Sequence, residues 1–382
     1  MINKKIEDCK KGLYIHIPFC VKKCNYCDFL SAPATRVQIA EYLTCLKREI
    51  AAYREFQYQA DTVFFGGGTP SLLLPSDIME LMEVLKSAFN IEETAEITME
   101  CNPETVDREK LYAMKRAGIS RVSFGLQSAS DRELELLGRI HNYERFLSAY
   151  AMAREAGFTN INIDLMSALP TQTESSWEET LRKVIALEPE HISAYSLIIE
   201  EGTEFYENAD TLMLPDEDAE RRMYYRTKEL LREAGYERYE ISNYARPGYE
   251  SRHNLKYWSG EDYIGMGLGA SSYLDGMRFH NPMDREAYRR KCGKLRELRE
   301  EEEILDKRQK MEEFCFLGLR RMRGISKTEF EKSFGCPIEE VYGSVLEELQ
   351  KKELLYIEET RIFLTEKGID LSNQVFTEFL LY

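Results

Sequence analysis

Three cysteines within eight residues are the feature of this sequence with the clearest chemistry. Cys20, Cys24 and Cys27 have the spacing C-x3-C-x2-C and directly follow the apolar run IHIPF. Thiolates are metal ligands and nucleophiles, and packing alone gives free thiols no reason to cluster. The group therefore predicts a metal or redox centre. The other six cysteines are scattered and are mostly interpreted as small buried apolar residues: Cys9, Cys45, Cys101, Cys292, Cys315 and Cys336.

Three kinds of centre compete for the clustered thiols. A structural zinc site has four ligands, but no second C-x2-C pair follows in the sequence. A redox pair would use Cys24 and Cys27 and leave Cys20 without a role. An iron–sulfur cluster is held by cysteine thiolates, and three of them on a four-iron cube leave one iron open for a ligand. The residues alone leave these three kinds of centre open, and we expect His16 to orient the cysteine loop.

The elements that must position these residues show a repeating pattern. In the first two-thirds of the chain, short β-type runs alternate with segments of helical periodicity. This alternation predicts a parallel sheet with right-handed crossovers, and its regular spacing favours a partial or full β/α barrel over a flat doubly wound sheet. The predicted strands are 13–17, 62–65, 95–100, 119–126, 160–166 and 191–197, and the predicted helices are 36–58, 76–89, 107–117, 143–156 and 174–187.

Helix boundaries carry their own signals. Ser76, which follows Pro75, is the predicted N-cap of the second helix. Gly118 and Gly157 stand where helices should end, because glycine adopts the left-handed conformation of a C-cap at little cost.

The predicted strands end in polar or glycine-rich sequence. After the cysteines, the next four ends read FGGGTPS, MECNP, FGLQS and IDLMSALP. In a β/α barrel, functional residues lie at the carboxyl ends of the strands. A glycine triplet lets a backbone approach a ligand closely, although it equally suits a tight strand-to-helix turn.

The pattern changes after about residue 215. A helix over 216–234 leads into a Gly- and aromatic-rich stretch, residues 284–323 are charge-dense and helical, and the tail reads helix, helix, hairpin, typical of a winged-helix-like module. Residues 324–382 hold six Lys or Arg against twelve Asp or Glu, which favours a packing or lid role over DNA binding. The predicted units are 1–240, 241–300 and 301–382.

The composition is acidic, with a formal net charge of −16 over 382 residues. Nucleic acids and anionic membranes select clustered Lys and Arg, so we expect neither nucleic-acid binding nor stable membrane insertion. No run approaches the ~20 apolar residues of a membrane helix, and the stretch MINKKIEDCKKG has no apolar core of a signal peptide. A cytoplasmic location is expected.

The cysteine spacing after YIHIPF resembles that of the radical S-adenosylmethionine (SAM) superfamily. The resemblance implies a partial (β/α)6 TIM-like barrel, a 4Fe-4S cluster on Cys20, Cys24 and Cys27, and SAM on the open iron. SAM carries an ammonium, a carboxylate and ribose hydroxyls, which the polar groups at the strand ends would suit.

Further blocks narrow the resemblance. GGGTP, ECNP, RVSFGLQS and NIDLMSALP read like the coproporphyrinogen-oxidase-related branch over most of residues 13–375, and RHNLKYW followed by GMGLGASS is similar to the radical SAM haem chaperones, the HemW family. The smaller C-terminal α+β unit would then be a domain of the HemN C-terminal type. The resemblance implies SAM contacts from Tyr14, Gly67, Gly68, Thr69, Glu100, Gln127, Arg139 and Asp164.

The oxygen-independent coproporphyrinogen III oxidases are the nearest alternative. Their pattern has a fourth cysteine two positions after the third, where this chain has Phe29. They also have a long N-terminal extension, whereas this chain reaches its first motif at Tyr14. Both differences disfavour the oxidase, while the three cluster ligands are intact.

Haem iron needs an axial ligand, most often histidine. His253 is the first choice because the resemblance links the RHNLKYW block to haem, and Tyr257 and Trp258 could stack on a porphyrin. The alternative is an ordinary loop histidine beside core aromatic residues. Weaker candidates are His280 and Cys336.

The resulting hypothesis is a chaperone that binds haem and transfers it to an acceptor, such as a respiratory haem protein. Its SAM-liganded 4Fe-4S cluster would affect transfer or formation of a homodimer. The alternative is a radical SAM enzyme that acts on a tetrapyrrole through a 5′-deoxyadenosyl radical, such as the oxidase. The resemblance implies flavodoxin or ferredoxin as the reductant.

Overall fold

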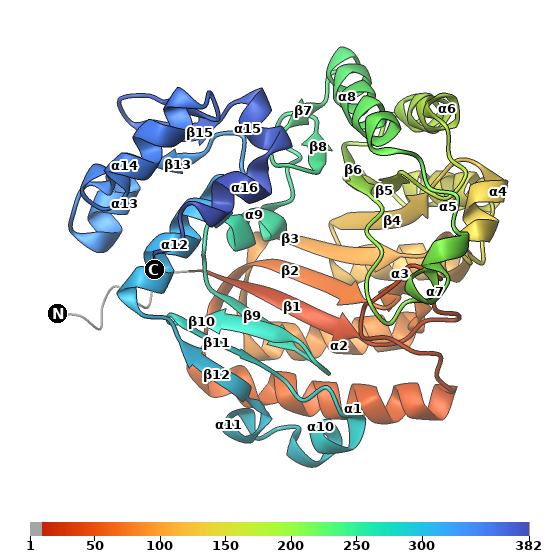
Figure 1. Ribbon diagram of the computed structural model, residues 1–382. Helices are drawn as coiled ribbons and strands as arrows, with labels where there is room; N and C mark the ends of the chain where they lie inside the picture. Colours follow the sequence, from red (N-terminus) through yellow and green to blue (C-terminus); the bar gives the residue numbers. More distant parts are fainter. Residues whose placement is uncertain (1–9, 382) are drawn as a thin grey trace.

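The protein is built on one long sheet whose centre is parallel, as predicted (Figure 1). The computed structural model describes residues 10–381. The central strands are β1 (Lys11–Ile17), β2 (Gln59–Gly67), β3 (Asn90–Cys101), β4 (Arg121–Gln127), β5 (Ile161–Ser167) and β6 (His191–Ser196). The helices between them are α1 (Arg36–Ala52), α2 (Pro75–Ala88), α3 (Arg108–Ala117), α4 (Asp131–Leu136), α5 (Tyr143–Glu155) and α6 (Glu174–Ile185). The short α4 was not predicted. Single 3₁₀ turns lie at Tyr53–Phe56, Pro70–Leu72, Pro103–Thr105 and Ala209–Thr211.

The register of the central strands brings their carboxyl ends to one edge. β1 and β2 place Ile17 beside Gly67, and β4 and β5 place Gly125 beside Asp164. The cysteine loop leaves β1 at this same edge, so the groups predicted to act together are carried on neighbouring strands.

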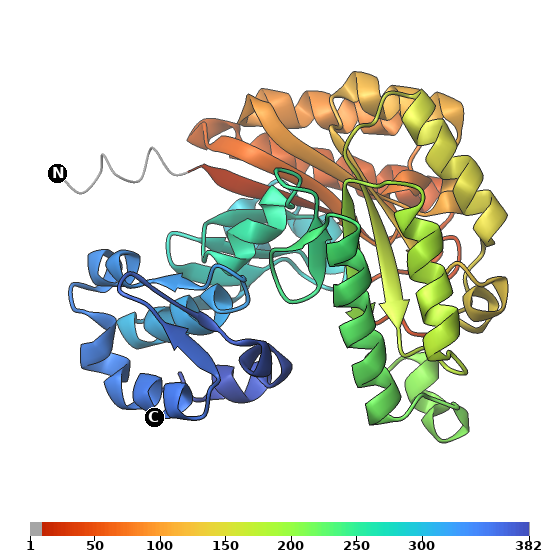
Figure 2. The same cartoon turned by 90° about the horizontal axis from the view of Figure 1, so that it is seen from above.

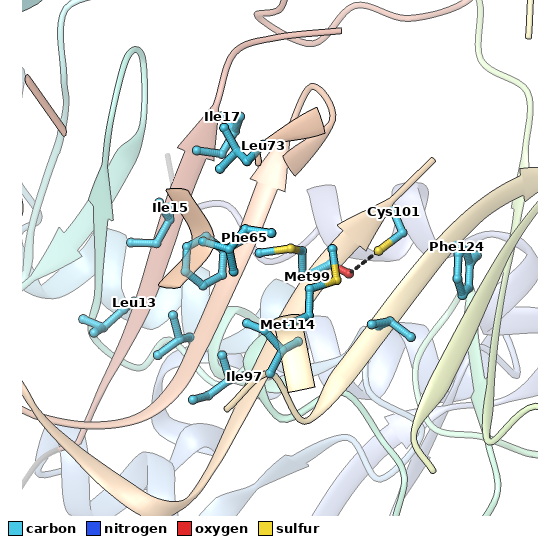
Figure 3. Close-up of a cluster of buried hydrophobic side chains, with 14 of the residues drawn as sticks. Leu13, Ile15, Ile17, Phe65, Leu73, Ile97, Met99, Cys101, Met114 and Phe124 are labelled. Carbon is cyan, nitrogen blue, oxygen red and sulfur yellow. Dashed lines mark hydrogen bonds between the residues drawn. The ribbon is translucent and has the colours of Figure 1, made fainter. Parts of the chain in front are cut away.

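The side chains of β1 alternate between the hydrophobic core and the opposite face of the sheet. Leu13, Ile15 and Ile17 have no exposed surface and pack with Phe65 and Met99 in the main hydrophobic cluster (Figure 3). Successive side chains of a strand point to opposite faces, so Tyr14 and His16 point away from this cluster. The apolar layer therefore holds the sheet against its helices, and the opposite face is left for polar chemistry.

Both edges of the sheet are extended by segments that follow the barrel repeat. β8 (Asn243–Ala245) and β7 (Glu237–Arg238) add antiparallel strands beside β6, while β9 (Tyr263–Met266) runs parallel to β1. Outside β9 lie β10 (Ser271–Leu274), β11 (Met277–His280) and β12 (Glu300–Ile304), all antiparallel. The helices of this region are α7 (Glu204–Glu207), α8 (Glu217–Glu233), α9 (Arg252–Trp258), α10 (Arg285–Lys291) and α11 (Leu295–Leu298).

The prediction of helix throughout 284–323 is wrong at β12. This segment reads EEEEI and forms an exposed edge strand against β11. Glutamate has good helix propensity, but pairing with β11 overrides it. A charged edge strand also disfavours pairing with other chains.

Two helix boundaries agree with the predictions and one does not. Gly118 and Gly157 are left-handed, with φ of 102° and 86°, at the ends of α3 and α5. Ser76 is not an N-cap, because Pro75 is already the first residue of α2. The side chain of Asp77 instead accepts a hydrogen bond from the Leu74 N–H, at 3.0 Å.

The C-terminal unit has its own hydrophobic cluster, drawn from residues 311–379. The predicted order helix, helix, hairpin is confirmed, with two further helices after it. Its elements are α12 (Lys307–Gly318), β13 (Ile325–Ser326), α13 (Lys327–Phe334), α14 (Ile338–Lys351), β14 (Leu355–Ile357), β15 (Arg361–Leu364), α15 (Glu366–Asp370) and α16 (Ser372–Thr377). Figures 1 and 2 show this unit on the side of the sheet away from α1 and α2.

The segment 241–300 shares the sheet and the main hydrophobic cluster with the barrel; the unit boundaries at 240 and 300 stay a prediction. Cys9 lies outside the described residues. In the part of the chain that the structure describes, no helix combines the length and apolar character needed to cross a membrane.

Candidate functional site

The cysteine loop joins β1 to α1 and is held at both ends. Ala32 N–H donates to the Pro18 carbonyl at 3.1 Å, and Cys20 N–H donates to the Ala32 carbonyl at 3.2 Å. His16 donates from Nε2 to the Leu30 carbonyl at 2.9 Å. The expected role of His16 in orienting the loop is therefore confirmed.

The three thiols are crowded enough to affect one another. Burial, together with the neighbouring thiols of Cys24 and Cys20, raises the pKa of Cys27 to about 11. Three thiolates so placed need nearby positive charge. Arg139 supplies part of it, since its Nη1 lies 3.5 Å from Cys24 Sγ.

The donors of the cysteine loop are three free thiols, the ligand type of iron–sulfur clusters. Within residues 10–381, no three His, Cys, Asp or Glu side chains converge as the ligands of one metal ion would. Each thiolate of a four-iron cube binds a different iron, so cluster ligands need not meet at one point. The three cysteines have the right chemistry and share one loop.

The glycine triplet places the end of β2 tightly against β1 and the cysteine loop. A Cβ on Gly67, whose φ is 109°, would lie 2.5 Å from the His16 ring. A Cβ on Gly68 would lie 2.6 Å from the Phe19 carbonyl oxygen. Thr69 follows, buried, and caps a 3₁₀ turn. Close packing alone therefore accounts for Gly67 and Gly68. A ligand at this edge of the sheet would contact backbone atoms.

Glu100 lies beside the glycines, at the end of β3. Its Oε2 accepts a hydrogen bond from the Gly67 N–H at 3.2 Å. Burial, and then the charge of Asp164, raises the pKa of Glu100 from 4.5 to about 8. Glu100 is half-buried and forms no salt bridge within the described residues, although the charge of Arg121 acts to lower its pKa. Such a carboxyl could pair with a cation, such as the ammonium of a ligand.

This shift makes a testable prediction about stability. Between pH 4.5 and 8 folded Glu100 holds a proton that the unfolded chain has lost, so the free energy of unfolding falls as the pH rises through this window. Glu100→Gln removes the titration. The free energy of unfolding of wild type relative to the variant should fall by about 2 kcal/mol between about pH 6 and about pH 9, as measured by urea denaturation of the ligand-free proteins.

Other buried acids, such as Glu49, titrate in both proteins and cancel in this difference. A difference that stays constant over the pH range would show that Glu100 is ionised throughout.

Gln127 ends β4, Asp164 lies on β5, and Arg139 lies between α4 and α5. Together with Gly67 and Glu100, these residues form what we call the arc. Arg139 donates from Nη2 to the Gly125 carbonyl, and a Cβ on Gly125 would lie 3.1 Å from Gln127 Nε2. Asp164 accepts hydrogen bonds from Ser123 Oγ at 3.0 Å and Asn162 Nδ2 at 2.7 Å. In the described structure the buried Nε of Arg139 has no hydrogen-bond partner. That orphaned donor is an independent sign that a polar ligand belongs here.

A cleft of about 530 Å³ lies beside this arc, and Gln127, Arg139 and Asp164 are not among its lining residues. Tyr14, Gly67 and Glu100 line one end beside Phe29 and Leu30 of the cysteine loop. The cleft then runs past α9 and β9–β11 toward α12. Aromatic side chains dominate that part of the wall: Tyr257, Trp258, Tyr263 and Tyr273.

A larger groove of about 1150 Å³ lies between α6 and α8. Its wall is made mostly of ion-paired charged residues and includes none of the predicted site residues. We therefore place the chemistry in the smaller cleft.

His253 lies behind the wall of the cleft and not on it. Its side chain is 1% exposed, Nδ1 is 2.8 Å from Thr62 Oγ1, and Nε2 is 2.8 Å from the Tyr257 hydroxyl. Burial, and then the charge of Lys256, lowers the pKa of His253 to about 3, so the ring is neutral. Nε2 is the nitrogen on the cleft side, with Tyr257 between it and the cavity.

Several lining residues were not singled out from the sequence, among them Tyr263, Tyr273, Arg278 and Glu313. Tyr263 and Tyr273 belong to the aromatic-rich stretch, and that enrichment is the signal that could have found them. Glu313 comes from α12, whose docking beside the cleft no local pattern shows.

Family models match two parts of the chain. That of the radical SAM superfamily matches residues 14–184, which hold the cysteine loop and the arc. That of the HemN C-terminal domain matches residues 305–371. The second match falls on the separate C-terminal cluster of hydrophobic residues.

Relatives match nearly the whole chain. "Heme chaperone HemW" of Lactococcus lactis is 37% identical over 96% of this chain and 97% of its own length. The protein of the same name from Bacillus subtilis is 38% identical over 97% of this chain and 99% of its own length. The solved structure of coproporphyrinogen III oxidase (HemN) from Escherichia coli, a radical SAM enzyme, has a TM-score of 0.86 over 98% of this chain and 91% of its own at 24% identity, and so shares the fold. The chain belongs to the HemW family of radical SAM proteins.

Proposed function

We propose that this chain is a haem chaperone, which binds haem and passes it to an acceptor protein. Relatives across nearly the whole length are haem chaperones by name. The observation that carries the proposal is the aromatic cleft, because a porphyrin is a large flat π-system that stacks on aromatic rings. The cleft begins at the predicted SAM site, so a ligand in it would lie against bound SAM.

Radical SAM proteins carry a 4Fe-4S cluster and SAM, and a reduced cluster of this kind supplies an electron to the sulfonium of SAM. In the proposal Cys20, Cys24 and Cys27 hold the cluster. Glu100 would pair with the ammonium of SAM and Arg139 with its carboxylate. The other proposed SAM contacts are Tyr14, Gly67, Gly68, Thr69, Gln127 and Asp164.

His253 is the proposed axial ligand of the haem iron. Metal-bound histidines usually have their second ring nitrogen fixed by a hydrogen bond, and the Nδ1 contact with Thr62 meets that requirement. The low pKa keeps the ring neutral, as a metal ligand must be. Binding requires Tyr257 to leave Nε2, which exposes that nitrogen to the cleft.

We expect His253→Ala to shift the Soret band of bound haem and to weaken haem binding at least about tenfold. Anaerobic haem titration followed by absorbance measures both. Tyr257→Phe is the matched control, because it removes the hydroxyl on Nε2 and leaves the imidazole and the aromatic wall. An unchanged spectrum and affinity in His253→Ala would exclude His253 as the ligand.

The chaperone function itself is tested by transfer. The reconstituted protein loaded with haem should pass it to an apo-form of a respiratory haem protein, and SAM with a flavodoxin or ferredoxin reductant should yield little 5′-deoxyadenosine in the presence of coproporphyrinogen III. Rapid 5′-deoxyadenosine formation with decarboxylation of the porphyrinogen would overturn the proposal in favour of an oxidase. Light scattering before and after haem loading tests the proposed homodimer.

A further inference from the structure

The far end of the cleft carries an ion pair between two units of the chain. Arg278 on β11 donates from Nη2 to Glu313 Oε2 at 2.8 Å, and its Nη1 contacts Oε1 of the same carboxylate. Glu313 lies on α12, the first helix of the C-terminal unit. The pair is therefore bidentate and joins the extended sheet to the C-terminal unit across the end of the cleft.

Arg278 is the only Lys or Arg among the described residues that line the cleft. Its guanidinium also lies over the Tyr273 ring, 5.7 Å from the centroid. The chain has a net charge of −16, so an anionic ligand reaches the cleft only where a local cation holds it. The cleft is lined by aromatic rings and has the guanidinium of Arg278 at its far end. This combination suits a flat ligand with a carboxylate at its edge.

The charge of the Glu313 carboxylate is only partly compensated by Arg278. Its side chain is 14% exposed, against 40% for Arg278. Burial raises the pKa of Glu313, even though Arg278 acts in the opposite direction. The charges of Glu303 and Glu312 also raise this pKa. The carboxylate of Glu313 is thus largely desolvated and is paired with a more exposed guanidinium, so the pair is open to exchange with a better-placed carboxylate.

We propose that Arg278 binds a propionate carboxylate of haem, and that Glu313 occupies Arg278 while the cleft holds no ligand. The proposal rests on the proposed function and adds the residue that recognises the acidic edge of the ligand. Arginine suits this role because its planar fork binds a carboxylate through two hydrogen bonds. Entry of haem then replaces an internal carboxylate with one from the ligand and releases the link between β11 and α12.

The test compares haem with haem dimethyl ester, in which both propionates are uncharged. Arg278→Gln is expected to weaken binding of haem about 10- to 100-fold and to leave binding of the ester unchanged. Glu313→Gln, which removes the competing charge at constant size, is expected to tighten haem binding roughly threefold to tenfold. Arg289→Gln is the control, since it breaks an exposed ion pair with Glu286 on α10 and should change neither affinity.

Each outcome decides between distinct conclusions. If wild type binds haem and ester equally and Arg278→Gln changes neither, the inference fails and the haem chaperone stands. If wild type binds neither ligand, the proposed function fails and the inference with it. If Arg278→Gln does not fold, Glu313→Gln carries the test alone, and an unchanged or weaker haem affinity in that variant overturns the competition between the two carboxylates.

Discussion

Replacing Cys24 with serine is expected to leave the protein with about a tenth or less of the wild-type iron after anaerobic reconstitution. A serine hydroxyl stays protonated at neutral pH and is a poor ligand for iron–sulfur clusters, so one corner of the cube loses its protein bond. Loss of an outer-shell partner alone costs metal sites 10- to 100-fold in affinity, and loss of a ligand should cost no less. The measurement is iron and sulfide per chain, with the visible charge-transfer absorption of the cluster.

Cys292→Ser is the matched control for this substitution. Cys292 is a half-buried free thiol outside the cysteine loop, so its replacement should leave the iron content unchanged. Full iron in Cys24→Ser, or stoichiometric zinc in wild type, would contradict the cluster. SAM binding should follow the iron, because the predicted site includes the open corner of the cube.

The central part of the fold could be predicted because its signals are local. Leu13, Ile15 and Ile17 alternate with Tyr14 and His16, and this period of two is enough to separate a core face from a polar face. The cysteines lie within one loop, so their spacing needs no tertiary information. The repeat of strand and helix then places every strand end at one edge. The family and the arc of polar residues follow from these local patterns.

The second wall of the cleft depends on contacts between distant segments. β9 pairs with β1, so that Tyr263 lies beside Gly12, a residue about 250 positions earlier in the chain. β12 is a strand only because β11 is beside it, since strand propensity depends strongly on the neighbours that a segment packs against. Glu313 reaches the cleft through the docking of α12. No local pattern could have paired it with Arg278.

His253 illustrates the same limit within the predicted site. The sequence block pointed to this residue, but its partner Thr62 lies 191 positions earlier. Burial behind Tyr257 is likewise a property of the folded chain. The sequence could therefore name the histidine and could not say that a tyrosine stands between it and the cleft.

Gly68→Ala is expected to lower the free energy of unfolding by about 1–3 kcal/mol, the usual range for overpacking, and to impair cluster assembly as well. The new Cβ would lie 2.6 Å from the Phe19 carbonyl oxygen and 2.9 Å from the Phe19 nitrogen. Both are backbone atoms, so no side chain can rotate away and the strand ends must separate. Gly68 N–H also donates to the Ile17 carbonyl at 2.9 Å, which ties β2 to the residue just before the cysteine loop.

The effect should be seen in two measurements on one protein. Urea denaturation of the cluster-free chain reports the loss of stability, and iron retention after reconstitution reports the displaced loop. Gly343→Ala is the control, because it lies inside α14 with open space around its Cβ position. Alanine there should stabilise the helix by roughly 0.5–1 kcal/mol and leave the iron content unchanged. If Gly68→Ala were as stable and as rich in iron as wild type, the glycine triplet would not be needed to bring β2 against the cysteine loop, and a turn requirement alone would explain it.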